Sequence, residues 1–122
     1  MISLKSLIYE NVVVEKILAF DKYILKKYPQ LEDFSLRPEG DNIISLSIIE
    51  IHEEDRGQGT GRRVMLELID WATKNGFTLH LQVRDMEEFD PPKRLAKLRK
   101  FYTSLGFVRQ NEYDFLRYPS TK

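Results

Sequence analysis

A run of isoleucines, followed by a glycine-rich loop and an amphipathic helix, sets the strongest limit on how this chain can fold. Residues 43–51 are too few and too rich in β-branched side chains for a good helix, and they predict a strand. Apolar residues occupy both alternating sets, which predicts a central strand covered on both faces. The loop at residues 52–61 follows, and then a helix with one apolar stripe runs to about Lys74.

The remaining elements surround this unit. Helices are predicted at residues 13–28 and 94–105, and strands at residues 34–37, 77–83, 107–108 and 113–118. In the first helix, five apolar residues fall near one face and are expected to be buried: Val14, Ile17, Leu18, Leu25 and Tyr28. This order of elements predicts an α/β or α+β sheet with helices packed on it.

Composition narrows the class of protein. The 122 residues make one domain, which we expect to span residues 1–122. The 19 basic and 19 acidic residues cancel, so the basic field typical of a nucleic-acid-binding domain is absent. Without cysteine the chain has no disulfide, thiolate metal site or cysteine nucleophile. No apolar run approaches the roughly 20 residues that span a bilayer, and no signal peptide is evident. We expect a cytoplasmic protein without a membrane partner.

The glycine loop between the central strand and its helix is suited to binding an anion. It comprises Arg56, Gly57, Gln58, Gly59, Thr60 and Gly61. The first turn of a helix leaves about four backbone N–H groups unpaired, and the helix dipole adds partial positive charge there. Glycines remove the Cβ atoms that would keep a ligand away. The loop therefore predicts a seat for a phosphate or pyrophosphate, with a ligand-free turn as the alternative.

Two common nucleotide motifs do not fit this loop. A P-loop needs a Lys-Ser/Thr pair after its last glycine, whereas Gly61 is followed by Arg62 and Arg63. A Rossmann fingerprint needs a third glycine where Arg62 or Val64 stands, depending on the starting glycine.

The spacing that fits is Arg/Gln-x-x-Gly-x-Gly/Ala, and a second motif lies downstream at residues 101–107, Phe-Tyr-Thr-Ser-Leu-Gly-Phe. Together these segments resemble the acetyl-CoA-binding motif and the Tyr-x-x-x-Gly-Phe segment of the GNAT N-acetyltransferase superfamily. The resemblance covers residues 43–118, and the two motifs occur in the same order as in the family. It implies a mixed, mostly antiparallel, twisted sheet with helices on both faces, whose central strands splay to admit CoA.

The resemblance also implies which residues hold acetyl-CoA, with no metal. Backbone amides of the glycine loop would bind the pyrophosphate, and the end of the central strand would pair with pantetheine as an added strand. Arg56, Arg62 or Arg63 would add positive charge near the phosphates, with simple solvation as the alternative for Arg62 and Arg63. The implied cofactor-binding residues are Ile49, Ile51, Arg56, Gly57, Gln58, Gly59, Thr60, Gly61 and Arg62.

The implied reaction is direct transfer of an acetyl group to an amine. Tyr102 matches the family tyrosine that protonates the leaving thiolate, and its alternative role is that of a core aromatic. Glu50 is the candidate general base. It alternates with Ile44, Leu46 and Ile48, so we expect burial to raise its pKa, unless the strand end is already solvated. His52 and His80 are alternative bases.

The chain departs from the usual family pattern in three places. Leu95 stands where many members have an asparagine, the connection at residues 84–93 is long and broken by prolines, and only about 40 residues precede the central strand. A shortened acceptor wall suits a protein substrate, or a site completed in a homodimer; a small-molecule amine stays open. The alternative function is a catalytically weak or inactive GNAT-like module that binds CoA or a protein partner.

A third hypothesis, of a different class, uses the basic helix at residues 93–100 to bind nucleic acid. Zero net charge and the lack of a recognition motif argue against it. We expect this basic face to be solvated or to lie near the cofactor's 3′-phosphate.

Overall fold

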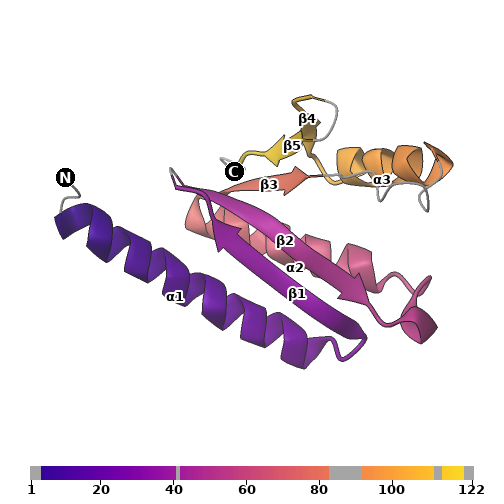
Figure 1. The fold of residues 1–122 in the computed structure, drawn as a ribbon, viewed down its shortest axis with the longest axis horizontal. Helices are drawn as coiled ribbons and strands as arrows, with labels where there is room; N and C mark the ends of the chain where they lie inside the picture. Colours follow the sequence, from indigo (N-terminus) through magenta and orange to yellow (C-terminus); the bar gives the residue numbers. More distant parts are fainter. Residues whose placement is uncertain (1–3, 41, 83–91, 112–113, 120–122) are drawn as a thin grey trace.

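The computed structural model describes residues 4–40, 42–82, 92–111 and 114–119 (Figure 1). Within these residues, three α-helices, a short 3-10 helix and five strands follow one another. They are α1 Leu4–Lys27, β1 Leu31–Pro38, β2 Ile43–Ile51, η1 Glu53–Asp55, α2 Thr60–Asn75, β3 Thr78–Gln82, α3 Pro92–Ser104, β4 Val108–Arg109 and β5 Asp114–Arg117. Among these helices, none combines the length and apolarity that crossing a membrane requires.

The strands form one open sheet in the order β1-β2-β3-β5-β4. β2 and β3 are parallel, and the other neighbouring strands are antiparallel. The expected mixed, mostly antiparallel α+β class is therefore confirmed. The expected helices on both faces are not seen in the described residues, since α1, α2 and the aromatic residues of α3 pack on the same face. β2 spans residues 43–51 as predicted and lies between two neighbours, but its second half is not covered on both faces, since Ile48 is 39% exposed.

The first helix is longer than predicted and is rotated about its axis. It begins at Leu4, and three of the residues expected in its buried face, Val14, Leu18 and Leu25, are exposed. The buried stripe is Val13, Ile17, Phe20, Ile24 and Tyr28. Both stripes are apolar at helical spacing, so periodicity alone could not decide between them. The aromatic rings decide, because Phe20 fits between the sheet and α2.

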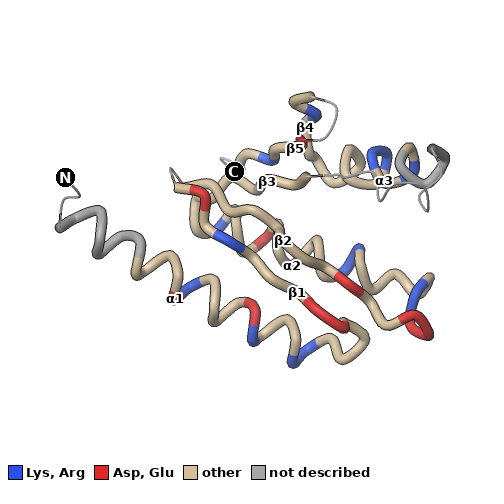
Figure 2. Tube along the Cα trace, in the orientation of Figure 1, with Lys and Arg blue, Asp and Glu red and all other residues tan. Residues whose placement is uncertain are grey.

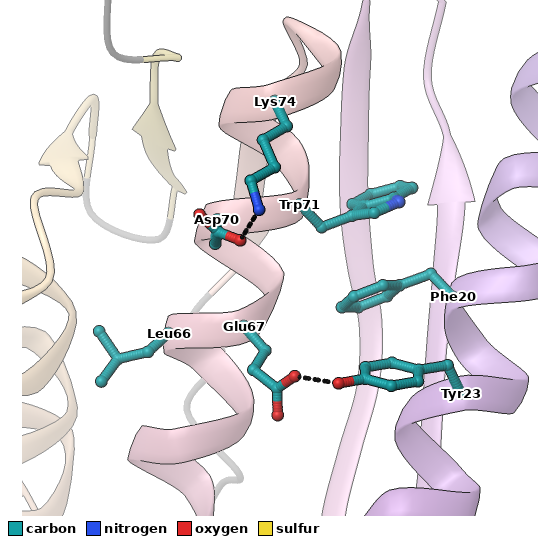
Figure 3. Close-up of a pocket in the computed structure, with 7 residues that line it drawn as sticks. All are labelled: Phe20, Tyr23, Leu66, Glu67, Asp70, Trp71 and Lys74. Carbon is teal, nitrogen blue, oxygen red and sulfur yellow. Dashed lines mark hydrogen bonds and ion pairs between the residues drawn. The ribbon is translucent and has the colours of Figure 1, made fainter. Parts of the chain in front are cut away.

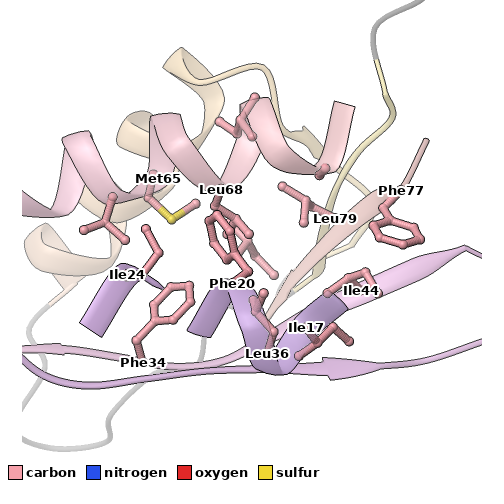
Figure 4. Close-up of a cluster of buried hydrophobic side chains, with 14 of the residues drawn as sticks. Ile17, Phe20, Ile24, Phe34, Leu36, Ile44, Met65, Leu68, Phe77 and Leu79 are labelled. Atoms are coloured by element: carbon pink, nitrogen blue, oxygen red, sulfur yellow. The ribbon is translucent and has the colours of Figure 1, made fainter. Parts of the chain in front are cut away.

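The core forms where α1 and α2 lie side by side on one face of the sheet (Figure 4). The Phe20 ring stacks on Trp71 of α2 at 4.7 Å between centroids and meets Phe34 of β1 edge-on at 6.1 Å. Ile44 and Leu79 continue the same buried layer across β2 and β3. We call the side of the sheet that carries this layer the core face. Burying large apolar side chains there supplies most of the driving force for this arrangement.

The other predicted boundaries differ by a few residues. β1 extends at both ends beyond residues 34–37, and α3 begins at Pro92. Gly76 ends α2 with a left-handed φ of 71°, and the Phe77 amide donates to the Ala72 carbonyl oxygen at 2.8 Å, so the predicted glycine stop is confirmed. Most of the predicted connection at residues 84–93 lies outside the described residues.

Candidate functional site

The glycine loop turns sharply between η1 and α2. Gly57 and Gly59 have φ values of 81° and 79°, a left-handed conformation that other residues rarely adopt. Gly59 is the N-cap of α2, where it offers no side-chain acceptor to the helix. A Cβ atom built on either glycine would meet nothing within 4 Å, so the space beside the loop is open.

The first turn of α2 leaves backbone donors free beside that space. The first helical hydrogen bond runs from the Arg63 amide to the Gly59 carbonyl oxygen at 3.2 Å. The amides of Thr60, Gly61 and Arg62 precede it and have no acceptor in the described part of the chain. With the helix dipole directed the same way, these three donors form the kind of helix N-terminus that is suited to binding a phosphate group.

Arginines surround this helix N-terminus. Arg56 Nε donates to the Ile51 carbonyl oxygen at 3.0 Å, which ties the loop to the end of β2. Arg62 and Arg63 are exposed on the first turn of α2, and Arg63 Nη2 lies 3.4 Å from the Thr60 hydroxyl oxygen. Figure 2 shows basic positions at the start of α2 and along α3. Of the predicted loop residues, Thr60 is the one whose side chain is buried, so it can offer a ligand only its backbone.

β2 and β3 diverge directly in front of this loop. Their parallel pairing covers only three residues of each strand, Ile43–Ser45 with Thr78–His80. β2 continues to Ile51 with no further partner on that side among the described strands, and Figure 1 shows the two strands separating. The expected splay of the central strands is present.

The backbone of β2 points its polar groups into this gap. The Phe34 amide is turned away from β2, because it donates to the Asp33 Oδ1 atom at 2.8 Å. Phe34 is opposite Ile49, and in an antiparallel pair both residues of such a pair direct their N–H and C=O groups outward. Ile49 therefore faces the gap, and so does Ile51 two residues on. Gly61 adjoins them, with a built Cβ 3.5 Å from Ile51 Cδ1.

A β-bulge at Ser47 changes the expected position of Glu50. Leu36 pairs with Leu46 but Ser35 pairs with Ile48, so Ser47 is one extra residue on β2. The extra residue reverses the alternation. Ile49 and Ile51 join Ile44 and Leu46 on the core face, and Glu50 lies on the opposite face beside Asp33. Glu50 is exposed, so the expectation that it is buried is wrong.

Tyr102 lies in an aromatic cluster near the end of α3. Its ring is 5.4 Å from Phe101, 6.0 Å from Phe107 and 6.3 Å from Phe115. Burial raises the pKa of its phenol above the usual value. No described residue hydrogen-bonds its hydroxyl group. Phe115 pairs with Leu81, which places the cluster on the core face. Tyr102 therefore makes the contacts of a core aromatic, while its role as a proton donor stays a prediction.

The two histidines differ in availability. His80 Nδ1 lies 2.9 Å from Glu39 Oε1 and His80 Nε2 lies 2.8 Å from Asp114 Oδ1, so both ring nitrogens are occupied. This is a hydrogen-bonded clamp and not a metal site, and no metal-binding group is formed by the described residues. His80 is therefore a poor general base. His52 follows β2 and is half-buried, and its amide donates to the Gln30 carbonyl oxygen.

A separate hollow of about 520 Å³ lies between α1 and α2 (Figure 3). Its charged groups are already paired. Tyr23 and Tyr28 donate to Glu67, Lys27 makes an ion pair with it at 3.1 Å, and Asp70 pairs with Lys74. Burial raises the pKa of Glu67, but these hydrogen bonds outweigh burial and lower it. The hollow contains none of the predicted site residues, and its polar groups stabilise the contact between the helices.

Comparisons with known proteins show a likeness in fold. No model of a known protein family matches the sequence, and no curated protein matches it either. A solved structure matches: "Crystal structure of putative N-acetyltransferase from Lactobacillus plantarum", with a TM-score of 0.56 and 16% sequence identity. The fold is GNAT-like. The match covers 71% of this chain and 59% of that protein, so the chain spans well under two-thirds of its length.

Proposed function

We propose that this chain is an acetyl-CoA-dependent N-acetyltransferase that transfers the acetyl group directly to an amine. One observation carries the proposal. The free amides at the start of α2 and the backbone groups that Ile49 and Ile51 direct into the gap meet at the same end of β2, where the Ile51 carbonyl oxygen already accepts from Arg56. A diphosphate attached to an amide-bearing chain needs both features, side by side.

Acetyl-CoA would be held mainly by the main chain. The amides of Thr60, Gly61 and Arg62 would take the pyrophosphate, with those of Gly57, Gln58 and Gly59 completing the loop. The Arg56 guanidinium has donors left beyond the one that it gives to Ile51, and these would add charge to the phosphates. The amide groups of pantetheine would pair with Ile49 and Ile51 in the gap between β2 and β3.

In the transfer step the amine nitrogen attacks the thioester carbonyl carbon. A C–N bond forms, the C–S bond breaks, the amine gives up a proton and the sulfur gains one. We assign the proton for the sulfur to the Tyr102 hydroxyl group, which has no competing partner among the described residues. We assign acceptance of the amine proton to Glu50, directly or through water. The two groups would work from opposite faces of the sheet.

The acceptor is an amine that reaches the thioester from the side of Glu50. That side has Glu50 and Ile48, both of which are exposed. We favour an acceptor large enough to supply its own contacts, such as a protein amine, or a site completed by a second copy of this chain.

Binding can be tested with two glycine variants of equal backbone strain. Gly59 and Gly40 have φ values of 79° and 81°, and a Cβ on either meets nothing within 4 Å. We expect calorimetry to show acetyl-CoA binding to the wild type and to Gly40→Glu, and at least about tenfold weaker binding to Gly59→Glu, because a carboxylate would occupy the phosphate seat. Equal binding by both variants would contradict the assignment.

Catalysis needs a second assay, in which CoA release is followed with a panel of amines. We expect Tyr102→Phe to lower kcat by about a hundredfold, with acetyl-CoA affinity unchanged, because a general acid contributes in this range. Glu50→Gln should lower kcat at constant affinity as well. Binding without release of CoA with any amine or peptide would favour the alternative, a binding module without activity.

A further inference from the structure

The turn that ends α3 depends on Gly106. This glycine has a φ of 92°, in the region that side chains disfavour. Its amide donates to the Thr103 carbonyl oxygen at 3.0 Å, and the Phe107 amide donates back to the Tyr102 carbonyl oxygen at 3.2 Å. These bonds close the helix end in the way that a left-handed glycine permits.

Gly106 also leaves room for an arginine from another strand. Arg117 of β5 reaches under the turn, and its Nε atom donates to the Leu105 carbonyl oxygen at 2.9 Å. A Cβ atom on residue 106 would lie 3.1 Å from that Nε atom, closer than ordinary contacts allow. Two features of this turn therefore favour glycine at position 106. One is the left-handed φ value, and the other is the guanidinium group of Arg117, which lies where a side chain would begin.

The clamped turn is the one that carries Tyr102. The Tyr102 carbonyl oxygen accepts from the amides of Leu105, at 3.0 Å, and Phe107. Leu105 in turn accepts from Arg117, so Tyr102 and the guanidinium group are joined through one residue. β5 also supplies Phe115, which contacts the Tyr102 ring from the same strand. A single strand therefore holds the tyrosine at its ring and at its backbone.

We propose that Arg117 is a positioning residue for Tyr102, fixing the end of α3 so that the phenol points at the leaving sulfur. The catalytic consequence rests on the proposed function, whereas the positioning itself does not. Arg117 acts through geometry: burial alone shifts the pKa of Tyr102, with no contribution from the arginine charge. Losing the Nε donor should therefore loosen the tyrosine even where the positive charge is kept.

A double-mutant cycle tests the catalytic part. Arg117→Lys keeps the charge and most of the stem but lacks the Nε donor. We expect it to lower kcat by about tenfold with KM for acetyl-CoA unchanged, and to cause no further loss in a Tyr102→Phe background. Arg109→Lys is the matched control and should leave kcat unchanged, since Arg109 of β4 also donates through Nε to a carbonyl oxygen, that of Asn111 two residues on. Equal losses with and without Tyr102 would overturn the proposal.

Alkaline spectrophotometric titration tests the positioning without any activity. Subtracting the titration curve of the Tyr102→Phe derivative from that of its parent protein isolates the signal of this phenol. In the wild type we expect the pKa of Tyr102 to lie above its usual value. In Arg117→Lys and Arg117→Met the pKa of Tyr102 should return toward its usual value, because the ring becomes solvated. Variants that are folded by circular dichroism, yet titrate like the wild type, would overturn the proposal. Absence of acetyl transfer in the wild type would count against the proposed function alone.

Discussion

At the scale of single residues, His80 joins two segments that are distant in the sequence. It lies between Glu39, after β1, and Asp114 of β5, with both ring nitrogens in hydrogen bonds. Burial lowers the pKa of His80, but the bonds to the two carboxylates outweigh burial and raise it. His80 pairs with Ser45 in the last register before β2 and β3 separate, so the clamp lies where the splay begins.

This clamp predicts a pH-dependent stability. The pKa of His80 is higher in the folded state than in the unfolded state, where it is about 6.5. Protonated His80 therefore stabilises the fold fully at a pH below the unfolded-state pKa, and this stabilisation is lost as the pH rises through the folded-state pKa. We expect His80→Gln to reduce the free energy of unfolding at pH 6 by about 1 kcal/mol, and much less at pH 9. Urea unfolding at both pH values measures this. An equal loss at both would mean that the imidazolium charge is irrelevant.

Asp21 of α1 shows the opposite dependence. Burial raises the pKa of Asp21 to about 6, the Leu36 main-chain amide lowers it, and the nearby Asp33 charge raises it. Asp21 Oδ1 is buried without a partner among the described residues. A raised carboxyl pKa destabilises the fold as pH increases from the unfolded value to about 6. We expect Asp21→Asn to stabilise the protein at pH 7 by about 1 kcal/mol after allowance for solvent.

The gain from Asp21→Asn should disappear near pH 4, where the wild-type carboxyl is protonated in the folded state. Thermal unfolding at pH 4 and pH 7 provides the comparison. Asp70→Asn is the control, because Asp70 is exposed and pairs with Lys74. A gain of the same size at both pH values would indicate a packing effect unrelated to the charge.

At the scale of elements, β1 is an edge strand whose outer side is already blocked. The Glu39 amide donates to the Ile43 carbonyl oxygen, so alternate residues from Glu39 backward face β2. The residues between them, Phe34, Leu36 and Pro38, direct their backbone outward. An unpaired row of this kind is a template for pairing with another chain.

Each outward position of β1 lacks a free donor for a different reason. The Phe34 amide donates to Asp33, the Leu36 amide faces the Asp21 carboxylate, and Pro38 has no N–H group. Charged side chains and proline are the usual protection of edge strands. These three positions therefore offer no free N–H donor to a strand from another chain.

Removing this protection should cause self-association. We expect the double variant Asp33→Ala/Pro38→Ala to form larger species with increasing concentration, because two outward donors become free. Light scattering after size-exclusion chromatography measures this. Glu32→Ala controls for the lost negative charge, since Glu32 is an exposed acid in the same strand. If Glu32→Ala associates equally, net charge and not the strand edge is responsible.

At the scale of the whole molecule, the proposed cofactor would join parts that are separate in the fold. The amides proposed to bind the phosphates belong to α2, the backbone proposed to pair with pantetheine belongs to β2, and Tyr102 belongs to α3. We expect acetyl-CoA at a hundred times its Kd to stabilise the protein by about 2.7 kcal/mol. Hydrogen exchange should slow at residues 49–51 and 57–62 and stay unchanged around Trp71, which lines the hollow between the helices. Protection confined to the hollow would contradict the assignment.

Local sequence signals were sufficient to predict the elements whose residues restrict the backbone most. The isoleucine run predicted β2 to the residue, and glycines marked the start and end of α2, because β-branched side chains and left-handed φ values restrict the backbone whatever surrounds it. The glycine loop was predicted for the same reason, and the Tyr-x-x-x-Gly-Phe segment was identified by its resemblance to the family motif. Nothing in the sequence distinguished Arg117 from other arginines, since its role comes from a contact between β5 and the end of α3.

The sequence by itself determined the order of strands and helices and the position of the glycine loop, because both depend on the conformational limits of neighbouring residues. The mixed, mostly antiparallel sheet was implied by the family resemblance. Only the tertiary structure decided which of two apolar stripes of α1 is buried and on which face Glu50 lies. The first depends on where the Phe20 ring finds room between Phe34 and Trp71. The second depends on one bulge residue, Ser47, whose presence is visible only in the pairing of β2 with β1.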